Sequence, residues 1–367
     1  MNKEVISVRQ GVILVILYLM GSTVLVGTGG AAKKDMWLAM IIAIVLAIPL
    51  FLFYSKLLAS FPGKNIYDIT ELAFGKLLGK IIILLYTWYA LHLGALVLNN
   101  YGEFINIVGL PDTPMIVPVM FFGILCAWVV KEGIEVLGRW GELYIAFFLG
   151  VLFITIFFAI PTMDINRIRP VLEEGLTPLI KGTIGIFAFP YAEAVMFTMI
   201  TPFYKDKKAI YKIYIYGLLW AGIILLVIVF RNLLTIGPDK ITMHYYPSYI
   251  AVGLINIGDF IQRAQILITV AFLITGFIKI SICLLAAVNG VAKLFNINEY
   301  RNIVVPVTIL MLNLSFIVYE NIMQTVTWAP EIYPYYAAIF QIILPVIIYI
   351  CASLRTRKTG QVEKSNL

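Results

Sequence analysis

The chain has 367 residues, of which 61% are apolar and only 13% are charged, and its mean hydropathy is +0.95. An ordinary soluble protein carries about 25% charged residues, so this composition offers too little polar surface to cover a soluble core of this size. It argues against a soluble enzyme, a nucleic-acid-binding protein and a disordered scaffold, and it indicates an all-α polytopic membrane protein. The formal net charge of +7 is then expected to mark cytoplasmic loops rather than an acidic partner.

Ten apolar runs follow one another along the chain, and a helix needs about 20 apolar residues to cross a bilayer. Membrane spans are predicted at 9–30, 36–60, 78–106, 115–131, 138–160, 178–203, 211–236, 260–292, 303–319 and 332–354. We therefore expect a single integral membrane domain over 1–354. The polar remainder, 355–367, is predicted to be a disordered cytoplasmic tail.

Positive charge predicts the orientation of these spans. If the N-terminus is cytoplasmic, the inner segments contain three times as many lysine and arginine residues as the outer segments. Because such an excess is typical of cytoplasmic segments, both termini are predicted to be cytoplasmic. The outer segment 237–258, which is rich in tyrosine, is expected to form an interfacial or re-entrant lid. An ordinary aromatic belt at the membrane surface is an equal alternative.

Helix-breaking residues interrupt the first and the sixth span. The first span contains Gly-Ser-Thr at 21–23 and three more glycines over 27–30, and the sixth contains Gly182, Gly185 and Pro190. Glycine weakens a helix, and proline removes a backbone donor and clashes with the preceding turn. Many transporters built from two inverted repeats have such breaks near the bilayer midplane, in the first helix of each repeat. The ten spans are therefore predicted to form two sets of five.

The predicted repeats, about 9–160 and 178–354, would bring the two breaks face to face. A broken helix exposes N–H groups, which suit a carboxylate, on one half. It exposes carbonyl groups, which suit an ammonium group or a metal cation, on the other half. Two facing breaks therefore predict a site for a small zwitterion such as a free amino acid. A kink that only relieves packing is the alternative, but the matching positions of the two breaks favour a site.

Several motifs resemble known families. The run Phe187-Ala-Phe-Pro-Tyr-Ala-Glu193 resembles the broken sixth helix of the amino acid–polyamine–organocation superfamily, and Gly21-Ser22-Thr23 resembles its Gly-Ser-Gly motif in the first helix. Over nearly the whole chain, the order of motifs resembles the B subunit of bacterial spore germinant receptors. The motifs that carry this second resemblance are Ser7-Val-Arg-Gln10, Phe61-Pro-Gly-Lys-Asn65, Phe74-Gly-Lys-Leu-Leu-Gly-Lys80, Thr201-Pro-Phe203, Tyr246-Pro247 and Phe260-Ile-Gln-Arg263.

The resemblance implies a leucine-transporter-type fold of five plus five helices, with helices 1 and 6 broken. It also implies a subunit that recognises a small germinant, often an amino acid, in complex with a receptor A subunit and a lipoprotein C subunit in the spore inner membrane. The third helix flanks the site in this fold, and Thr23, in place of a glycine, would narrow the pocket. The expected ligand-binding residues are Gly21, Ser22, Thr23, Tyr89, Phe187, Ala188, Phe189, Tyr191 and Glu193.

Two ionisable residues lie deep inside predicted spans, Glu193 in the sixth and Lys279 in the eighth. A charge inside the membrane is costly unless it is paired or wetted, so it indicates a functional site. In the resembling fold the eighth helix faces the first near a sodium site of some transporters. Lys279 is therefore predicted to substitute for that cation or to carry a proton. A structural link from Lys279 to Glu193 or to a nearby carbonyl is the alternative.

Two functions fit such a pocket: a germinant-sensing subunit, or an amino acid permease driven by protons or sodium. A membrane-embedded enzyme is not expected, because the sequence has no catalytic Ser/His/Asp or paired-carboxylate pattern. No cofactor, metal or nucleic-acid partner is expected. Cys126, Cys283 and Cys351 lack metal-ligand spacing, and His92 and His244 are the only histidines.

Overall fold

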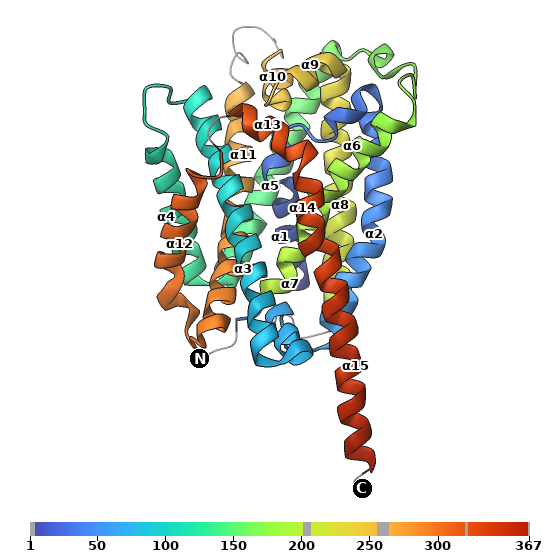
Figure 1. Cartoon of the computed structure of the whole chain (residues 1–367). Coiled ribbons are helices and arrows are strands. Elements are labelled where there is room, and N and C mark those ends of the chain that lie inside the picture. The colour runs from blue at the N-terminus through green and yellow to red at the C-terminus, as the bar shows by residue number, and fades with distance from the viewer. Residues whose placement is uncertain (1–3, 201–206, 255–263, 320–321, 366–367) are drawn as a thin grey trace.

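The chain forms an upright bundle of helices (Figure 1). The computed structural model describes residues 4–200, 207–254, 264–319 and 322–365, and every regular element within these ranges is a helix. The first and the last described residues lie at the same end of the bundle. A helix satisfies its own backbone hydrogen bonds, which is what the interior of a bilayer requires of a spanning segment.

The first half of the chain contains five spans. Its elements are α1 (Val8–Met20), the short turns η1 (Ser22–Val24) and η2 (Gly30–Asp35), α2 (Met36–Ser60), α3 (Ile66–Val108), α4 (Ile116–Glu132) and α5 (Ile134–Ala159), followed by η3 (Ile160–Thr162) and η4 (Ile165–Ile168). Ser7 and Gln10 form a capping box at the start of α1, and Asn65 and Asp68 form one at the start of α3. These reciprocal bonds satisfy backbone donors that a helix start leaves free.

The second half repeats this order. Its elements are α6 (Leu176–Ala188), η5 (Tyr191–Val195), α7 (Met196–Ile200), α8 (Lys207–Ile236), α9 (Pro238–Met243), α10 (Pro247–Gly253), α11 (Ala264–Phe295), η7 (Tyr300–Ile303), α12 (Val304–Ser315), α13 (Ile322–Glu331), α14 (Tyr333–Ala338), the π-helical turn η8 (Ile339–Ile343) and α15 (Leu344–Ser365). The sixth span is α6 with η5 and α7, and the tenth is α14, η8 and α15.

Contacts between the helices reveal the two-fold relationship of the halves. α1 packs against α8, and its counterpart α6 packs against α2. In the same way α4 packs against α11 while α12 packs against α3, and α5 packs against α11 while α15 packs against α3. Each contact recurs with the roles of the two halves exchanged, as inverted repeats require. The predicted five-plus-five architecture is confirmed by this reciprocity.

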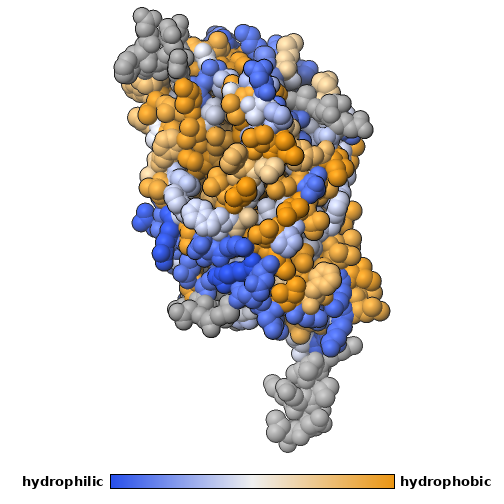
Figure 2. Space-filling model, turned by 90° about the vertical axis from the view of Figure 1, so that its left-hand side faces the viewer, coloured by the Kyte–Doolittle hydropathy of each residue, from blue (hydrophilic) through white to orange (hydrophobic). Residues whose placement is uncertain are grey.

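The outer surface of the bundle is suited to lipid. Seven helical stretches among the described residues are long and apolar enough to span a membrane, and the shorter α1, α4 and α12 take the first, fourth and ninth positions. Figure 2 shows one face on which hydrophobic residues cover much of the middle, while hydrophilic residues gather towards the end that carries the chain termini. Large apolar side chains such as Phe121, Leu143 and Phe153 are more than 60% exposed. In a membrane protein such side chains contact lipid.

The observed boundaries differ from the predicted spans by about ten residues at three places, and by less elsewhere. The helix of the first span ends at Met20, before the predicted 30, because its glycine-rich second half does not continue as an α-helix. The third helix begins at Ile66 rather than 78, because Gly75, at φ 76°, joins a polar helical segment to the span. α15 continues beyond 354 to Ser365, and disorder of the tail stays a prediction.

The predicted lid segment contains two short helices, α9 and α10, at the end of the bundle opposite the chain termini (Figure 1). Each begins with a proline, Pro238 and Pro247, at a position where the missing N–H costs no helical bond. α9 packs against η2, and α10 packs against α8 and α11. The segment therefore lies beside the unwound part of the first span, while residues 255–258 lie outside the described residues.

Candidate functional site

Both predicted helix breaks are present. α1 ends at Met20, Gly21 follows with φ 12° and ψ −119°, and residues 25–29 lie outside any helix. In the sixth span α6 ends at Ala188, and Phe189 is extended with φ −134° and ψ 113° before the short turn η5. Because these segments leave the helical ladder, their backbone groups need other partners.

Lys279 and Glu193 form an ion pair inside the bundle. The Nζ atom of Lys279 lies 2.6 Å from Oε2 of Glu193, and both side chains are fully buried. Lys279 stands near the centre of α11, and Glu193 stands just after the break in the sixth span. Either charge would be costly to bury alone, so each compensates the other. The link between these two residues, inferred from sequence as one alternative, is therefore present in the structure.

A chain of hydrogen bonds extends from this pair into the tenth span. The Tyr333 hydroxyl donates to Oε1 of Glu193. The hydroxyls of Tyr333 and Tyr89 lie 3.3 Å apart, and Nε2 of Gln341 donates to Tyr89 at 2.9 Å. These residues connect the third, sixth and tenth spans through fully buried polar groups, where a satisfied network is rigid and a broken one is costly.

Side chains of the protein donate hydrogen bonds to carbonyl oxygens that have no helical partner because of the breaks. The Gly21 carbonyl accepts hydrogen bonds from the hydroxyls of Tyr101 and Thr275, at 3.2 and 3.1 Å. Three carbonyls of the second break are occupied in the same way: Ala188 by Gln341 at 3.0 Å, Ala192 by Tyr54 at 3.1 Å and Glu193 by Tyr18 at 3.3 Å. The acceptors expected to face an ammonium group or a cation are thus already bonded within the protein, and we call this arrangement closed.

The side chain of Lys279 fills the space beside the first break. A Cβ atom at Gly21 would lie 2.3 Å from Cδ of Lys279, so only glycine leaves room for this side chain. The Lys279 ammonium lies 4.7 Å from the ring centroid of Phe189 and 5.3 Å from that of Tyr18. Both distances are within the range of a cation–π interaction. One lysine therefore contacts residues from both broken helices.

Of the expected site residues, Gly21, Phe189 and Glu193 contact Lys279 directly, and Tyr89 reaches the pair through Tyr333. Ala188 joins the same network through its carbonyl. The two breaks and the third span thus meet at one place.

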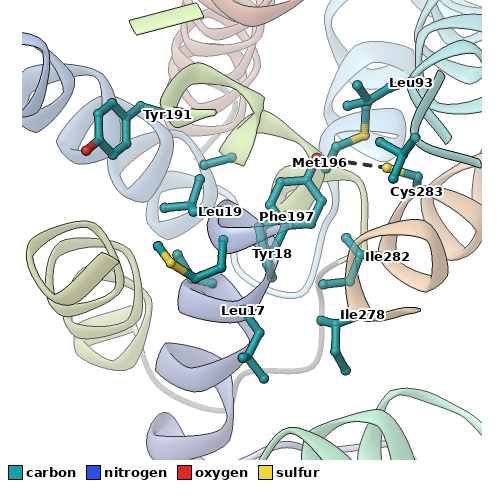
Figure 3. Close-up of a cluster of buried hydrophobic side chains, with 14 of the residues drawn as sticks. Leu17, Tyr18, Leu19, Leu93, Tyr191, Met196, Phe197, Ile278, Ile282 and Cys283 are labelled. Atoms are coloured by element: carbon teal, nitrogen blue, oxygen red, sulfur yellow. Dashed lines mark hydrogen bonds between the residues drawn. The ribbon is translucent and has the colours of Figure 1, made fainter. Parts of the chain in front are cut away.

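Tyr191 lies apart from this place. Its hydroxyl donates to Sδ of Met40 on α2 at 3.0 Å. Figure 3 shows Tyr191 separated from a cluster around Tyr18. In this cluster the Tyr18 ring packs edge-on against Phe197, and the Tyr18 hydroxyl contacts Cys283. The side chain therefore faces the second helix rather than the ion pair, because η5 turns it to the opposite side.

Three further expected residues have surroundings other than the pair in the contacts of the described chain. Phe187 is half-buried against the apolar core. The Thr23 hydroxyl donates to the carbonyls of Leu19 and Met20, at 2.8 and 2.7 Å, and so satisfies carbonyls at the end of α1. The Ser22 hydroxyl is buried and has no hydrogen-bond partner in the described part of the chain.

A small cleft lies beside the unwound part of the first span, on the side of α9 and α10. Polar and apolar groups from η1, the unwound segment 25–29, α2, α8, α9 and α10 surround it. Its lining residues are Thr23, Val26, Gly27, Thr28, Met36, Leu225, Ile228, Val229, Asn232, Ile241 and Pro247. Of the expected site residues only Thr23 borders this cleft.

Sequence reasoning missed several residues of the network. Gln341 is the only amide in the apolar run 339–350, and this isolation was a usable signal. Tyr18, Tyr54 and Tyr333 carried no such signal, because 21 tyrosines are spread along the chain. Among the described residues no three or more His, Cys, Asp or Glu side chains gather into a group that could hold a metal ion.

The family model of spore germination proteins matches residues 5–324. The chain belongs to the spore germination protein family. Spore germination protein KB of Bacillus subtilis (strain 168) is 26% identical to it over 362 residues, with 98% of this chain and 97% of that protein covered. Two other members from the same organism, the putative spore germination protein YfkT and spore germination protein A2, are 26% and 23% identical, with 87% and 90% of each chain covered.

This member of the spore germination protein family also resembles a solved transporter. Mhp1, a nucleobase-cation-symport-1 family transporter in a closed conformation with bromovinylhydantoin bound, superposes with a TM-score of 0.70 over 99% of this chain and 94% of that one. The sequences are only 13% identical, so the similarity concerns the fold. Together with the two broken helices, it confirms the leucine-transporter-type architecture of an integral membrane protein.

Proposed function

We propose that this chain is the germinant-sensing membrane subunit of a spore germination receptor, and that a small amino-acid-like ligand binds at the unwound segments of helices 1 and 6. Membership of the spore germination protein family supports a role in spore germination. The observation that carries the ligand site is the buried Lys279–Glu193 pair at the meeting point of both breaks. Such a pair is a functional feature by default in a membrane span.

In this proposal Lys279 substitutes for a cation. Its ammonium already pairs with Glu193 and lies on the face of Phe189, in the space next to Gly21. An amino-acid ligand brings an ammonium group of its own, which can compete with Lys279 for Glu193. Because the zwitterion has no net charge, its entry leaves the net charge of the buried site unchanged, and Glu193 keeps a cationic partner throughout. A role of Lys279 as a proton carrier is the alternative for the same residue.

A ligand acts as a signal only if it prefers one conformation. In the closed arrangement, hydrogen bonds from Tyr54, Tyr101 and Gln341 hold the released carbonyls. A ligand that binds between the breaks would replace some of these bonds and would favour a more open arrangement of the two repeats. Receptor A and lipoprotein C subunits would detect this change. In this proposal the chain lies in the spore inner membrane or the bacterial cell membrane, with both termini cytoplasmic.

An amino acid permease coupled to protons or sodium is the second candidate, and the similarity to Mhp1 favours it. Passage of a solute between the breaks would require the Lys279–Glu193 pair and the capping hydrogen bonds to open in every cycle. A sensor needs only one such change, which is why we place sensing first. An enzymatic activity forms no part of the proposal.

The two candidates are separated by reconstituting the full chain alone in proteoliposomes and adding a pooled mixture of the twenty radiolabelled L-amino acids. We expect retained label that the unlabelled mixture displaces, without net uptake against a gradient. The Glu193→Gln variant should lose this binding. The control variant is Lys293→Met, which removes a partly exposed lysine of α11, the helix that carries Lys279. Lys293 pairs with Asp68 and Glu71 rather than with Glu193, so this variant should retain the binding. Sustained uptake driven by a proton or sodium gradient would establish the permease instead.

A further inference from the structure

A second buried charge lies outside the ion-pair network. Arg231 of α8 is only 2% exposed. Its Nε and one terminal nitrogen donate to Oδ1 of Asn232, at 3.2 and 2.9 Å, and its other terminal nitrogen donates to Oγ1 of Thr155 at 3.2 Å. No carboxylate of the described residues forms an ion pair with it. Within the described part of the chain, the guanidinium therefore has only neutral partners.

This arrangement is costly for a structural arginine. A guanidinium stays charged in proteins, and a buried charge is normally paired with an opposite one. Arginine also carries five N–H donors in a planar fork, of which Arg231 uses three on the partners just described. Two N–H groups remain, one on each terminal nitrogen. A guanidinium with free N–H groups can bind the oxygens of a carboxylate.

Arg231 is one side chain away from the cleft. Asn232, which accepts two of its hydrogen bonds, borders the cleft together with Gly27 and Thr28 of the unwound first span. The amide nitrogen of Asn232 donates to Oγ of Ser248 at 2.9 Å, and Ser248 belongs to α10 above the same cleft. The chain of bonds therefore joins a positive charge, a cleft and the short outer helix.

We propose that Arg231 and Asn232 form the anion subsite of the germination receptor's ligand, with the ligand's carboxylate bound in this cleft. In the ligand-free state the Asn232 amide oxygen accepts the hydrogen bonds of the guanidinium. A carboxylate takes its place, pairs with Arg231 and releases Asn232 from Ser248, so that binding is reported to α10. The inference rests on the proposed function, because it assigns the negative end of the same amino-acid-like ligand.

A purely structural role would make Arg231 a tie between α5 and α8. The Asn232→Asp variant separates the two roles, because it supplies a permanent carboxylate where Asn232 already contacts Arg231. If Arg231 is an anion subsite, this variant is more stable without ligand and no longer distinguishes ligands by their carboxylate. If Arg231 is only a tie, the variant leaves ligand discrimination as it is in the native protein.

The experiment measures thermal unfolding of the full chain in lipid nanodiscs with two probes. One is an equimolar mixture of the twenty L-amino acids, and the other is the matched mixture of their carboxamides, which lack the carboxylate. Bound ligand raises the midpoint temperature. We expect the native chain to be stabilised by the acids and not by the amides. Arg231→Gln and Asn232→Asp should lose this difference, whereas Arg231→Lys, which keeps the charge but loses the fork, should retain part of it.

Each result has one meaning. Equal stabilisation by acids and amides, or an acid preference that survives in both Arg231→Gln and Asn232→Asp, would overturn the anion subsite and leave the proposed function standing. No response of the native chain to either mixture would overturn both. Should Arg231→Gln fail to fold, Asn232→Asp decides the matter, since its added carboxylate compensates a buried charge and is expected to raise the midpoint temperature.

Discussion

Lys279 reaches Glu193 by passing Gly21 so closely that a single added carbon at Gly21 would lie 2.3 Å from the lysine Cδ. The first broken helix therefore provides space, because Gly21 has no side chain, and the sixth provides the carboxylate of Glu193. Glycine at this position serves two purposes, since it ends α1 and also makes room for the buried ion pair.

Gly21→Ala is expected to destabilise the closed arrangement by about 1–3 kcal/mol, the usual cost of overpacking a filled site. The new methyl group would contact both the Lys279 stem and the Tyr18 carbonyl. Thermal unfolding in nanodiscs measures the effect. Gly150→Ala is the matched control, because nothing lies within 4 Å of a Cβ there, and it should not lower the midpoint, since alanine favours a helix over glycine. Equal effects of the two variants would contradict the close approach.

Removing one member of the ion pair should cost more than removing both. Lys279→Met leaves Glu193 buried without its cation, and Glu193→Gln leaves Lys279 without its anion, so each is expected to lose about 3–5 kcal/mol. The double variant removes both charges and should recover much of that loss. Unfolding free energies of the three variants form a double-mutant cycle that gives the coupling directly. Strictly additive losses would show that the pair contributes no interaction.

Tyr333→Phe is expected to cost about 1–3 kcal/mol, because it leaves Oε1 of Glu193 without its hydroxyl donor in a buried site. The comparison variant is Tyr335→Phe, two residues along the same helix, where the side chain is 73% exposed. Its stability should match that of the native chain. If both variants unfold at the native midpoint, the hydroxyl of Tyr333 does not support the carboxylate.

Gln341→Leu is expected to loosen the break in the sixth span. It removes the amide that donates to the Ala188 carbonyl and to Tyr89, so the carbonyl loses its partner. Hydrogen exchange of the backbone amides over 189–193 should become faster, which mass spectrometry detects. Asn313→Leu, which removes an exposed amide from α12, serves as the control. Unchanged exchange over 189–193 would show that Gln341 does not hold the break.

Much of the architecture follows from local chemistry and could be predicted. Ten spans follow from apolar runs, since any segment in lipid must satisfy its backbone within itself. The breaks at Gly21 and Pro190 could be expected because glycine and proline weaken a helix most where several of them cluster, whereas the single Pro49 is accommodated inside α2. The candidate charges Glu193 and Lys279 also stood out, since ionisable groups in apolar runs are rare.

The partners of these groups could not be predicted, because they come from helices far apart in sequence. That Lys279 meets Glu193, and that Tyr333 and Gln341 of the tenth span complete the network, depends on how the two repeats face each other. Tyr191 faces away for the same reason. Hydropathy and helix-breaking are properties of short segments, and so the sequence alone determined the spans and their interruptions. Side-chain contacts depend on the relative rotation of packed helices, which only the tertiary structure decided.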